Sequence, residues 1–209
     1  MKPVILFDID GTLADTFDTS MHIAKKLAPH YHIPLLPDYE IEKLRHLTVR
    51  EILRTVGIPW YRFPFFISAI RKELTNRMHK VKPFPGVKNV IKTLRQQGYE
   101  LGIISSNSRK NVDIFLNENK FTAFHHIHAG IGMFSKPRAL AHFKPHVIYI
   151  GDEVRDIEAA RKAGIPIIAV TWGYSSKNAL KQHHPDALVS SSEQLLAAIR
   201  RIALKSSRQ

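Results

Sequence analysis

Two patterns of hydrophobic and polar residues divide the chain. A short apolar run over residues 3–7 ends in carboxylates and predicts a buried parallel strand. From about Asp15 to Lys82 the apolar residues recur at helical spacing, and no segment there reads as a convincing strand. After Pro83-Phe84-Pro85-Gly86 the pattern becomes an alternation of strands and helices. The sequence therefore predicts an α-helical block placed inside an α/β chain.

The helical block contains three predicted helices. The first covers residues 16–28, the second follows Thr48 and Glu51, which have capping-box spacing, and the third covers residues 64–78. Helix-breaking residues separate the three: Pro34, Pro37, Gly57 and Pro59.

The rest of the chain alternates. Strands are predicted at residues 99–104, 126–129, 146–150, 166–170 and 187–189. Helices are predicted at residues 87–97, at 110–119, at 154–163 and after Ser190, which has capping-box spacing to Glu193. Such alternation predicts an α/β fold with a Rossmann-like, mostly parallel sheet that helices cover on both faces. We expect a core of residues 1–14 and 83–205, an inserted helical domain of residues 15–82, and a basic tail of residues 206–209.

Composition changes this picture little. The chain has 209 residues, 44% hydrophobic and 23% charged, no cysteine, and a formal net charge of +13. We see no secretory signal and no apolar run that could span a bilayer, so we expect a cytoplasmic protein without a membrane partner. The positive charge favours anionic ligands, but lysine and arginine are spread along the chain. Nucleic acid is therefore the less favoured partner.

The chemistry is expected at the carboxyl ends of the strands, where open parallel sheets bind ligands. Asp8 and Asp10 follow the first strand, Ser105 follows the second, and Asp152 follows a later one, while Lys136 is expected in a loop between elements. Two carboxylates so close together repel each other unless a cation compensates them. Magnesium prefers such hard oxygen ligands, so we expect a Mg²⁺ site that includes Asp8 and Asp152.

Four segments in chain order resemble the motifs of the haloacid dehalogenase (HAD) superfamily. They are Asp8-Ile9-Asp10-Gly11-Thr12-Leu13, Ser105, Lys136 and Gly151-Asp152-Glu153-Val154-Arg155-Asp156. The resemblance implies a HAD-like core. The helical block resembles the mobile cap of phosphoglycolate-phosphatase-like members, which would open for substrate and close to exclude water.

The resemblance also implies a mechanism. Asp8 would be the nucleophile that forms an aspartyl-phosphate, and Asp10 would be the general acid and base. The metal would be held by Asp8, by the backbone carbonyl of Asp10 and by Asp152. Dehalogenase members lack the second aspartate, so Asp10 favours a phosphatase.

The remaining site residues have supporting roles in this interpretation. Phosphate would be bound by Ser105, Ser106, Lys136 and Gly11. Further support would come from Asp156, Glu153 and Thr12. The resulting hypothesis is a Mg²⁺-dependent phosphatase that hydrolyses a small phosphorylated metabolite, with phosphoglycolate as the family-level candidate. A phosphomutase of the same fold and a non-catalytic nucleic-acid-binding or regulatory protein are the alternatives, and the oligomeric state stays open.

Three sets of side chains have more than one interpretation. Aromatic residues interleave with Arg62, which favours packing within the cap or against the core over a base-stacking platform: Trp60, Tyr61, Phe63, Phe65 and Phe66. Four arginines are candidates for a second anionic group of the substrate: Arg45, Arg50, Arg54 and Arg62. Two histidine clusters favour surface roles over metal binding: His125, His126 and His128, and His183 with His184.

Overall fold

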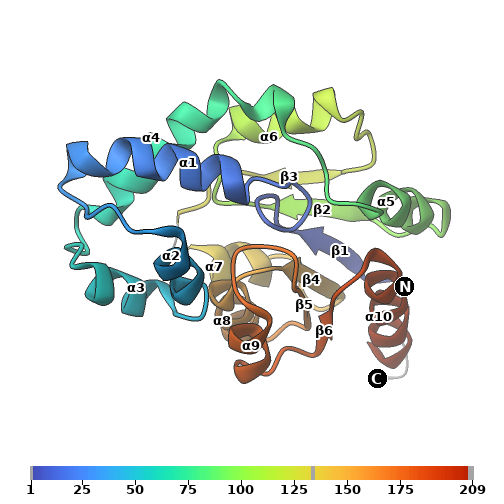
Figure 1. Cartoon of the computed structure of the whole chain (residues 1–209). Coiled ribbons are helices and arrows are strands. Elements are labelled where there is room, and N and C mark those ends of the chain that lie inside the picture. Colours follow the sequence, from blue (N-terminus) through green and yellow to red (C-terminus); the bar gives the residue numbers. More distant parts are fainter. Residues whose placement is uncertain (1, 133–134, 207–209) are drawn as a thin grey trace.

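The computed structural model describes residues 2–132 and 135–206 (Figure 1). Within these ranges six parallel strands form one sheet in the order β3-β2-β1-β4-β5-β6. The strands are β1 (Val4–Phe7), β2 (Leu101–Ile104), β3 (His126–His128), β4 (Val147–Gly151), β5 (Ile167–Val170) and β6 (Ala187–Val189). Strand β1 is central, with Ile5 opposite Leu101 of β2 on one side and Ile148 of β4 on the other.

Helices cover both faces of the sheet. One face carries α5 (Val87–Gln96), α6 (Arg109–Glu118) and α10 (Ser192–Ser206). The other face carries α7 (Lys136–Ala141), α8 (Val154–Ala163) and α9 (Lys177–Gln182). Because side chains alternate along a strand, Ile5 and Phe7 pack toward the first face and Leu6 toward the second. Because helices cover both faces of the sheet at β1, the sequence of this strand is a continuous apolar run.

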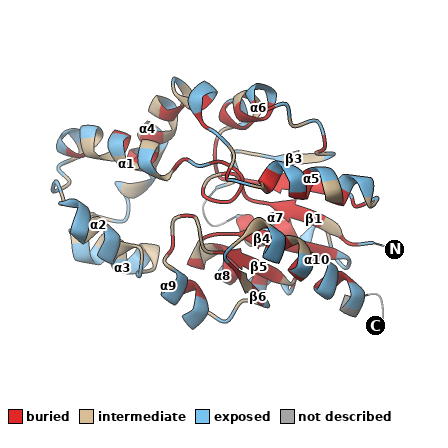
Figure 2. Ribbon diagram, turned by 45° about the vertical axis from the view of Figure 1, so that its right-hand side comes forward, coloured by how far each residue is buried: buried red, intermediate tan, exposed pale blue. Residues whose placement is uncertain are grey.

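A second group of helices follows β1 and is called the cap from here on. Its members are α1 (Phe17–Leu27), the 3-10 turn η1 (Ala28–Tyr31), α2 (Asp38–Leu44), α3 (Val49–Val56), α4 (Phe63–Thr75) and the 3-10 turn η2 (Met78–Lys80). Helix α1 packs on α4, and α4 on α6 of the core. None of the residues of α2 and α3, all of them described, is buried, whereas every residue of β2 and β4 is (Figure 2).

The predicted elements are largely confirmed. The Thr48 capping box is present, since Glu51 N donates to Thr48 Oγ1 and the Glu51 carboxylate accepts from Thr48 N. The short helices α2, α7 and α9 were not predicted, because six or seven residues contain too few apolar positions to show a helical period.

The predicted cap of the last helix is wrong. Gln194 N donates to Ser191 Oγ, and Gln194 Oε1 accepts from Ser190 N, so the start lies one residue later than the Ser190–Glu193 spacing indicated. Consecutive serines offer equivalent hydroxyls, and the sequence does not distinguish between them.

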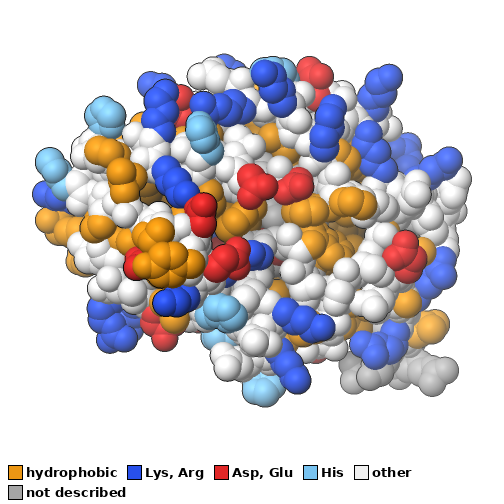
Figure 3. Space-filling model, in the orientation of Figure 1, with side chains coloured by type: hydrophobic (Ala, Val, Ile, Leu, Met, Phe, Trp, Pro, Cys, Tyr) orange, Lys and Arg blue, Asp and Glu red, His pale blue; other side chains and the backbone are white. Residues whose placement is uncertain are grey.

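The domain boundaries stay a prediction, and residues 207–209 of the expected tail lie outside the described residues. No helix in the described ranges is long and apolar enough to cross a membrane. The face in Figure 3 shows lysine and arginine side chains scattered around its rim, without one continuous basic patch.

Candidate active site

The polar residues that follow β1, β2 and β4 meet at one edge of the sheet. Asp8 comes directly after β1, Ser105 after β2 and Asp152 after β4. Asp8 N donates to Ile150 O at 2.9 Å, which holds the end of β1 beside the end of β4. Because β1 lies between β2 and β4, residues almost 150 positions apart in the chain become neighbours.

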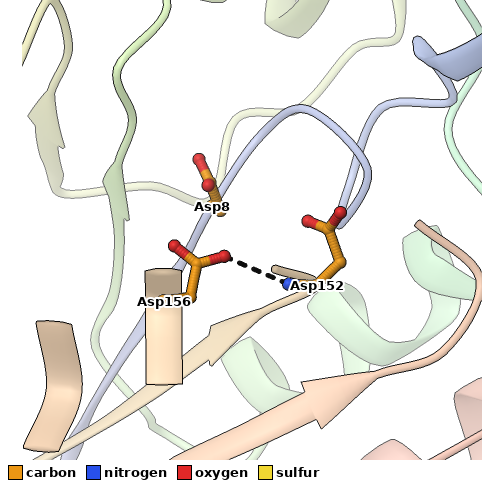
Figure 4. A group of neighbouring side chains, drawn as sticks. All are labelled: Asp8, Asp152 and Asp156. Atoms are coloured by element: carbon orange, nitrogen blue, oxygen red, sulfur yellow. Dashed lines mark hydrogen bonds between the residues drawn. The ribbon is translucent and has the colours of Figure 1, made fainter. Parts of the chain in front are cut away.

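Three carboxylates form the centre of the site. Asp8, Asp152 and Asp156 each offer an oxygen within 4.8 Å of the others, the one such group found among the described residues (Figure 4). The three residues are 2%, 0% and 0% exposed. So many buried acidic groups need positive charge beside them.

Lys136 supplies part of that charge. Its ammonium donates to Asp8 Oδ2 at 2.6 Å and to Asp156 Oδ1 at 2.6 Å, and the residue is 4% exposed. Burial alone would lower the pKa of Lys136, but Asp156 and Asp8 outweigh it and raise the pKa, so the side chain is a cation. The sequence suggested a loop lysine, whereas Lys136 is the first residue of α7.

The Asp156 carboxylate is fully occupied by hydrogen bonds to its neighbours and is not free to bind a metal ion. Its Oδ1 accepts from Lys136 Nζ and from the Tyr149 hydroxyl, and its Oδ2 accepts from the backbone N–H groups of Asp152 and Glu153. These four donors fill the acceptor capacity of a carboxylate. Burial opposes ionisation of Asp156, yet Lys136 and Arg155 outweigh it and lower its pKa.

Asp8 and Asp152 keep acceptor capacity for a cation. Asp152 Oδ1 accepts from Thr12 Oγ1 and its Oδ2 from Tyr174 N, both at 2.7 Å. Asp8 Oδ1 accepts from Ile9 N at 2.8 Å. Burial, together with neighbouring carboxylates, raises the pKa of both aspartates. A divalent cation would reverse that shift, and these hard oxygen donors fit Mg²⁺.

Asp10 is held apart from this cluster. Asn107 Nδ2 donates to both of its carboxylate oxygens, at 3.1 and 2.9 Å. Asn107 is fixed in turn, because its Oδ1 accepts from Ser108 N and Asn111 Nδ2. Burial, and then the nearby Asp8, raises the pKa of Asp10, which favours a carboxyl group that can carry a proton. Its backbone carbonyl as a metal ligand stays a prediction.

Two of the predicted phosphate-binding residues, Ser105 and Ser106, lie with Asn107 in the loop between β2 and α6. Ser105 Oγ accepts from Asn107 N at 3.1 Å, and Ser106 Oγ accepts from Arg71 Nη2 at 2.9 Å. Gly11 has φ +76°, and a Cβ there would lie 2.1 Å from Asp152 Oδ2. Gly11 N donates to Ala14 O. The absence of a side chain at Gly11 gives the Asp152 carboxylate room to approach the loop. The phosphate contacts of these residues stay predictions.

The cap contacts the core beside this site. Arg45 Nε donates to Tyr174 O at 3.0 Å and its Nη2 to Gly173 O at 2.8 Å, while Ser176 N donates to Arg45 O. On α4, Arg71 reaches Ser106, and Asn111 Nδ2 donates to Arg71 O. These contacts join two cap segments to two core loops.

A cavity of about 320 Å³ lies among the cap helices and ends at the core, where Asp10 lines it. Of the four candidate arginines, Arg45 lines the cavity and Arg50, Arg54 and Arg62 do not, so the expectation was wrong for those three. Sequence reasoning did not single out Arg71, Asn107 or Tyr174. Asn107 lies two residues after Ser105, and that spacing was its one available signal.

The aromatic segment divides in two. Phe66 is buried and Phe63 lines the cavity, as packing within the cap requires. Trp60, Tyr61 and Phe65 are 78%, 55% and 69% exposed, so packing was the wrong interpretation for these three. The histidines belong to no group of potential metal ligands found among the described residues.

Comparison with known proteins agrees with the geometry. Residues 5–170 match the haloacid dehalogenase-like hydrolase family. A phosphoglycolate phosphatase of Synechococcus elongatus is 34% identical, covering 93% of this chain and 96% of its own. A pyrophosphatase PpaX of Anoxybacillus flavithermus is 26% identical, covering 93% and 95%. The crystal structure of a predicted phosphatase from Clostridium acetobutylicum has a TM-score of 0.78 at 20% identity, covering 96% and 99%. The chain belongs to the haloacid dehalogenase-like hydrolases.

Proposed function

We propose that this haloacid dehalogenase-like hydrolase is a Mg²⁺-dependent phosphatase that hydrolyses a small phosphomonoester through an aspartyl-phosphate on Asp8. One observation carries the proposal: two aspartates on one loop have different partners. The Asp8 carboxylate is bound by Lys136 within the buried cluster, whereas Asp10 is bound by Asn107 and lines the cavity. Such a difference separates a nucleophile from a general acid.

In the first step an Asp8 oxygen attacks phosphorus, and the bond from phosphorus to the leaving oxygen breaks. Asp10 gives its proton to that oxygen, so the leaving group departs as an alcohol. Lys136 stays hydrogen-bonded to Asp8 and offsets negative charge that grows nearby. Ser105 and Ser106 are proposed to hold phosphate oxygens.

In the second step Asp10, now a carboxylate, takes a proton from water, and the oxygen of that water attacks phosphorus. The bond between phosphorus and Asp8 breaks, and phosphate leaves. Asn107 keeps Asp10 in place in both steps, since it donates to both carboxylate oxygens.

Asp8 and Asp152 would hold the metal, with Thr12 and Tyr174 N orienting Asp152. When bound, Mg²⁺ supplies positive charge that allows an anionic nucleophile to approach an anionic phosphoester. Glu153 contributes indirectly, because its side chain pairs with Arg155 at the rim of the site.

The test is release of phosphate from an aryl phosphate with Mg²⁺ and with excess chelator, by the native protein and by Asp8→Asn. We expect turnover in the native protein with Mg²⁺ alone and a phosphorylated Asp8 in quenched samples analysed by mass spectrometry. Undiminished turnover by Asp8→Asn would contradict the assignment. Isomerisation of a sugar phosphate without phosphate release would instead support a mutase.

The core residues do not define the organic part of the substrate. Phosphoglycolate is the candidate that the named relative supplies. Another relative is named a pyrophosphatase, so the family core serves more than one leaving group. The leaving group depends on the cap.

A further inference from the structure

The cavity beside Asp10 lies between two pairs of cap helices. Helices α1 and α4 form one wall, and α2 and α3 form the opposite wall. Its volume, about 320 Å³, falls within the usual range of small-molecule sites, roughly 300–1,000 Å³. In Figure 1 the two pairs are separate arms of the cap, α1 and α4 above and α2 and α3 below, and loops at the left of the view connect them.

Both walls are mostly apolar, and each carries a helical stripe. On α2 and α3 the lining residues are Ile41, Leu44, Val49, Ile52 and Val56. Facing them on α4 are Phe66 and Ile70, one helical turn apart.

These stripes are not used for packing α2 and α3. All residues of the two helices are described and none is buried, although α3 is strongly amphipathic. Apolar stripes that face each other normally close on one another, because each Å² removed from water contributes about 25 cal/mol. A cap whose stripes instead flank a cavity has room for an apolar guest.

The polar end of the cavity is the proposed catalytic site. Asp10, Ser106 and Asn107 line it there, next to Arg71 and Arg155. Asp10 is proposed to protonate the leaving oxygen, so the leaving group has to lie on the side of Asp10 that faces the cavity. Asp8, by contrast, is 2% exposed within the carboxylate cluster.

A charged leaving group has little to bind along the walls. Three of the four described cationic side chains that line the cavity have carboxylate partners: Lys25 with Asp38, Arg45 with Glu42 and Arg155 with Glu153. The fourth, Arg71, donates to the neutral Ser106 hydroxyl at the polar end of the cavity. Arg155 Nε is buried without a partner among the described residues, so a donor is available to the phosphate ester at the polar end. Burying an unpaired carboxylate against the apolar walls would be costly.

We propose that the leaving group of the substrate is apolar, a hydrocarbon chain or ring that fills this cavity, and is not a short carboxylated group such as glycolate. The inference rests on the proposed phosphatase function, since it uses Asp10 to place the leaving group. In this proposal α2 and α3 select the substrate through their apolar surface.

The experiment compares ethyl, butyl and hexyl phosphate with 2-phosphoglycolate, all in Mg²⁺. We expect kcat/KM to rise roughly fourfold for each added methylene that the walls cover, about 250-fold over the four methylenes from ethyl to hexyl phosphate. We expect 2-phosphoglycolate to be turned over no faster than ethyl phosphate. A flat alkyl series, or 2-phosphoglycolate as the best of the four, would overturn the inference and leave the phosphatase proposal standing.

Two variants on α3 distinguish an effect of the cavity lining from a general effect of changing the helix surface. Ile52 lines the cavity, whereas Thr55 is exposed and does not. Ile52→Asn is expected to lower kcat/KM for hexyl phosphate about tenfold and for ethyl phosphate less than twofold, and Thr55→Asn to change neither. Equal effects of the two variants would count against the assignment.

Binding provides a readout that does not need turnover. Calorimetry with Asp8→Asn is expected to show tighter binding of hexyl than of ethyl phosphate, with a more negative heat-capacity change. Such binding without turnover of any phosphoester by the native protein would overturn the phosphatase proposal but support the apolar cavity. Equal binding of the two esters would refute the cavity inference.

Discussion

The core and the cap use their residues in opposite ways. In the core, helices cover the six-stranded sheet on both faces, and the buried carboxylates of the site are paired, as Asp8 and Asp156 are with Lys136. In the cap, α2 and α3 bury none of their residues, all of which are described, and their apolar stripes border a cavity. The core is preorganised for one chemistry, and the cap keeps apolar surface available for a ligand.

The difference explains which functional features a relative can share. A buried cluster held by many hydrogen bonds tolerates little change, because removing one partner leaves another group unsatisfied. Half-exposed stripes can exchange one apolar residue for another at small cost. We therefore expect relatives to share the buried carboxylate cluster, and the proposed leaving group to depend on this particular cap.

Replacing Asp10 tests the core side of this comparison most severely. Asp10→Asn removes the proposed proton donor and is expected to lower kcat by about 10²- to 10⁴-fold, with folding unchanged. Steady-state phosphate release measures it. Asp18→Asn, an exposed change at the start of α1, is the control and should retain activity. Equal activity of the two variants would remove Asp10 from the mechanism.

Removing Lys136 tests how far the core depends on its buried charges. Lys136→Met leaves Asp8 and Asp156 without their shared cation, so we expect a loss of about 3–5 kcal/mol in the free energy of unfolding. Urea titration measures it, with the exposed Lys110→Met as control. A loss below about 1 kcal/mol would show that the two carboxylates do not need this lysine.

Arg45 joins the two regions, and its replacement should have a smaller effect. Arg45→Met removes the donors to Gly173 O and Tyr174 O that hold the cap on the core. We expect kcat/KM to fall about tenfold with little change in unfolding free energy. Arg54→Met, on an exposed part of α3, is the control and should have no effect. If both arginines mattered equally, surface charge and not cap docking would be the cause.

The smallest effect is expected within the cap. Thr48→Ala removes the capping box of α3 and should destabilise that helix by about 1 kcal/mol, seen as faster amide hydrogen exchange across residues 49–56. Thr55→Ala is the control.

Hydrogen bonds from Thr48 lower the pKa of Glu51 below its ordinary 4.5. Their contribution is therefore present above that pH and lost as pH falls through the lower value. Protection of residues 49–56 against exchange that does not fall with pH would contradict this contribution of Glu51.

The carboxylates of the candidate site were the most predictable part of the molecule. Asp8, Asp10 and Asp152 each directly follow or lie close to a predicted strand, and strand ends of a parallel sheet meet at one edge. Local signals such as the Thr48 capping box were also readable, because they depend on residues three positions apart.

Other features could not be read in this way. Lys136 has no distinctive neighbours in sequence, and its burial between Asp8 and Asp156 depends on α7 packing against α8. The arginines of the cap look equivalent in sequence, yet Arg45 lines the cavity and Arg54 does not. Exposure of Trp60 and Phe65 is likewise a matter of how helices pack.

The sequence by itself determined the α/β alternation, the helical insertion and the carboxylates of the family, since periodicity and strand-end position are local properties of the chain. Tertiary structure decided which cation neutralises Asp8, which amide holds Asp10 and which apolar faces stay open. The physical reason is that pairing and packing depend on distances between residues far apart in the chain. Those distances exist only after the cap and the core have folded around the site.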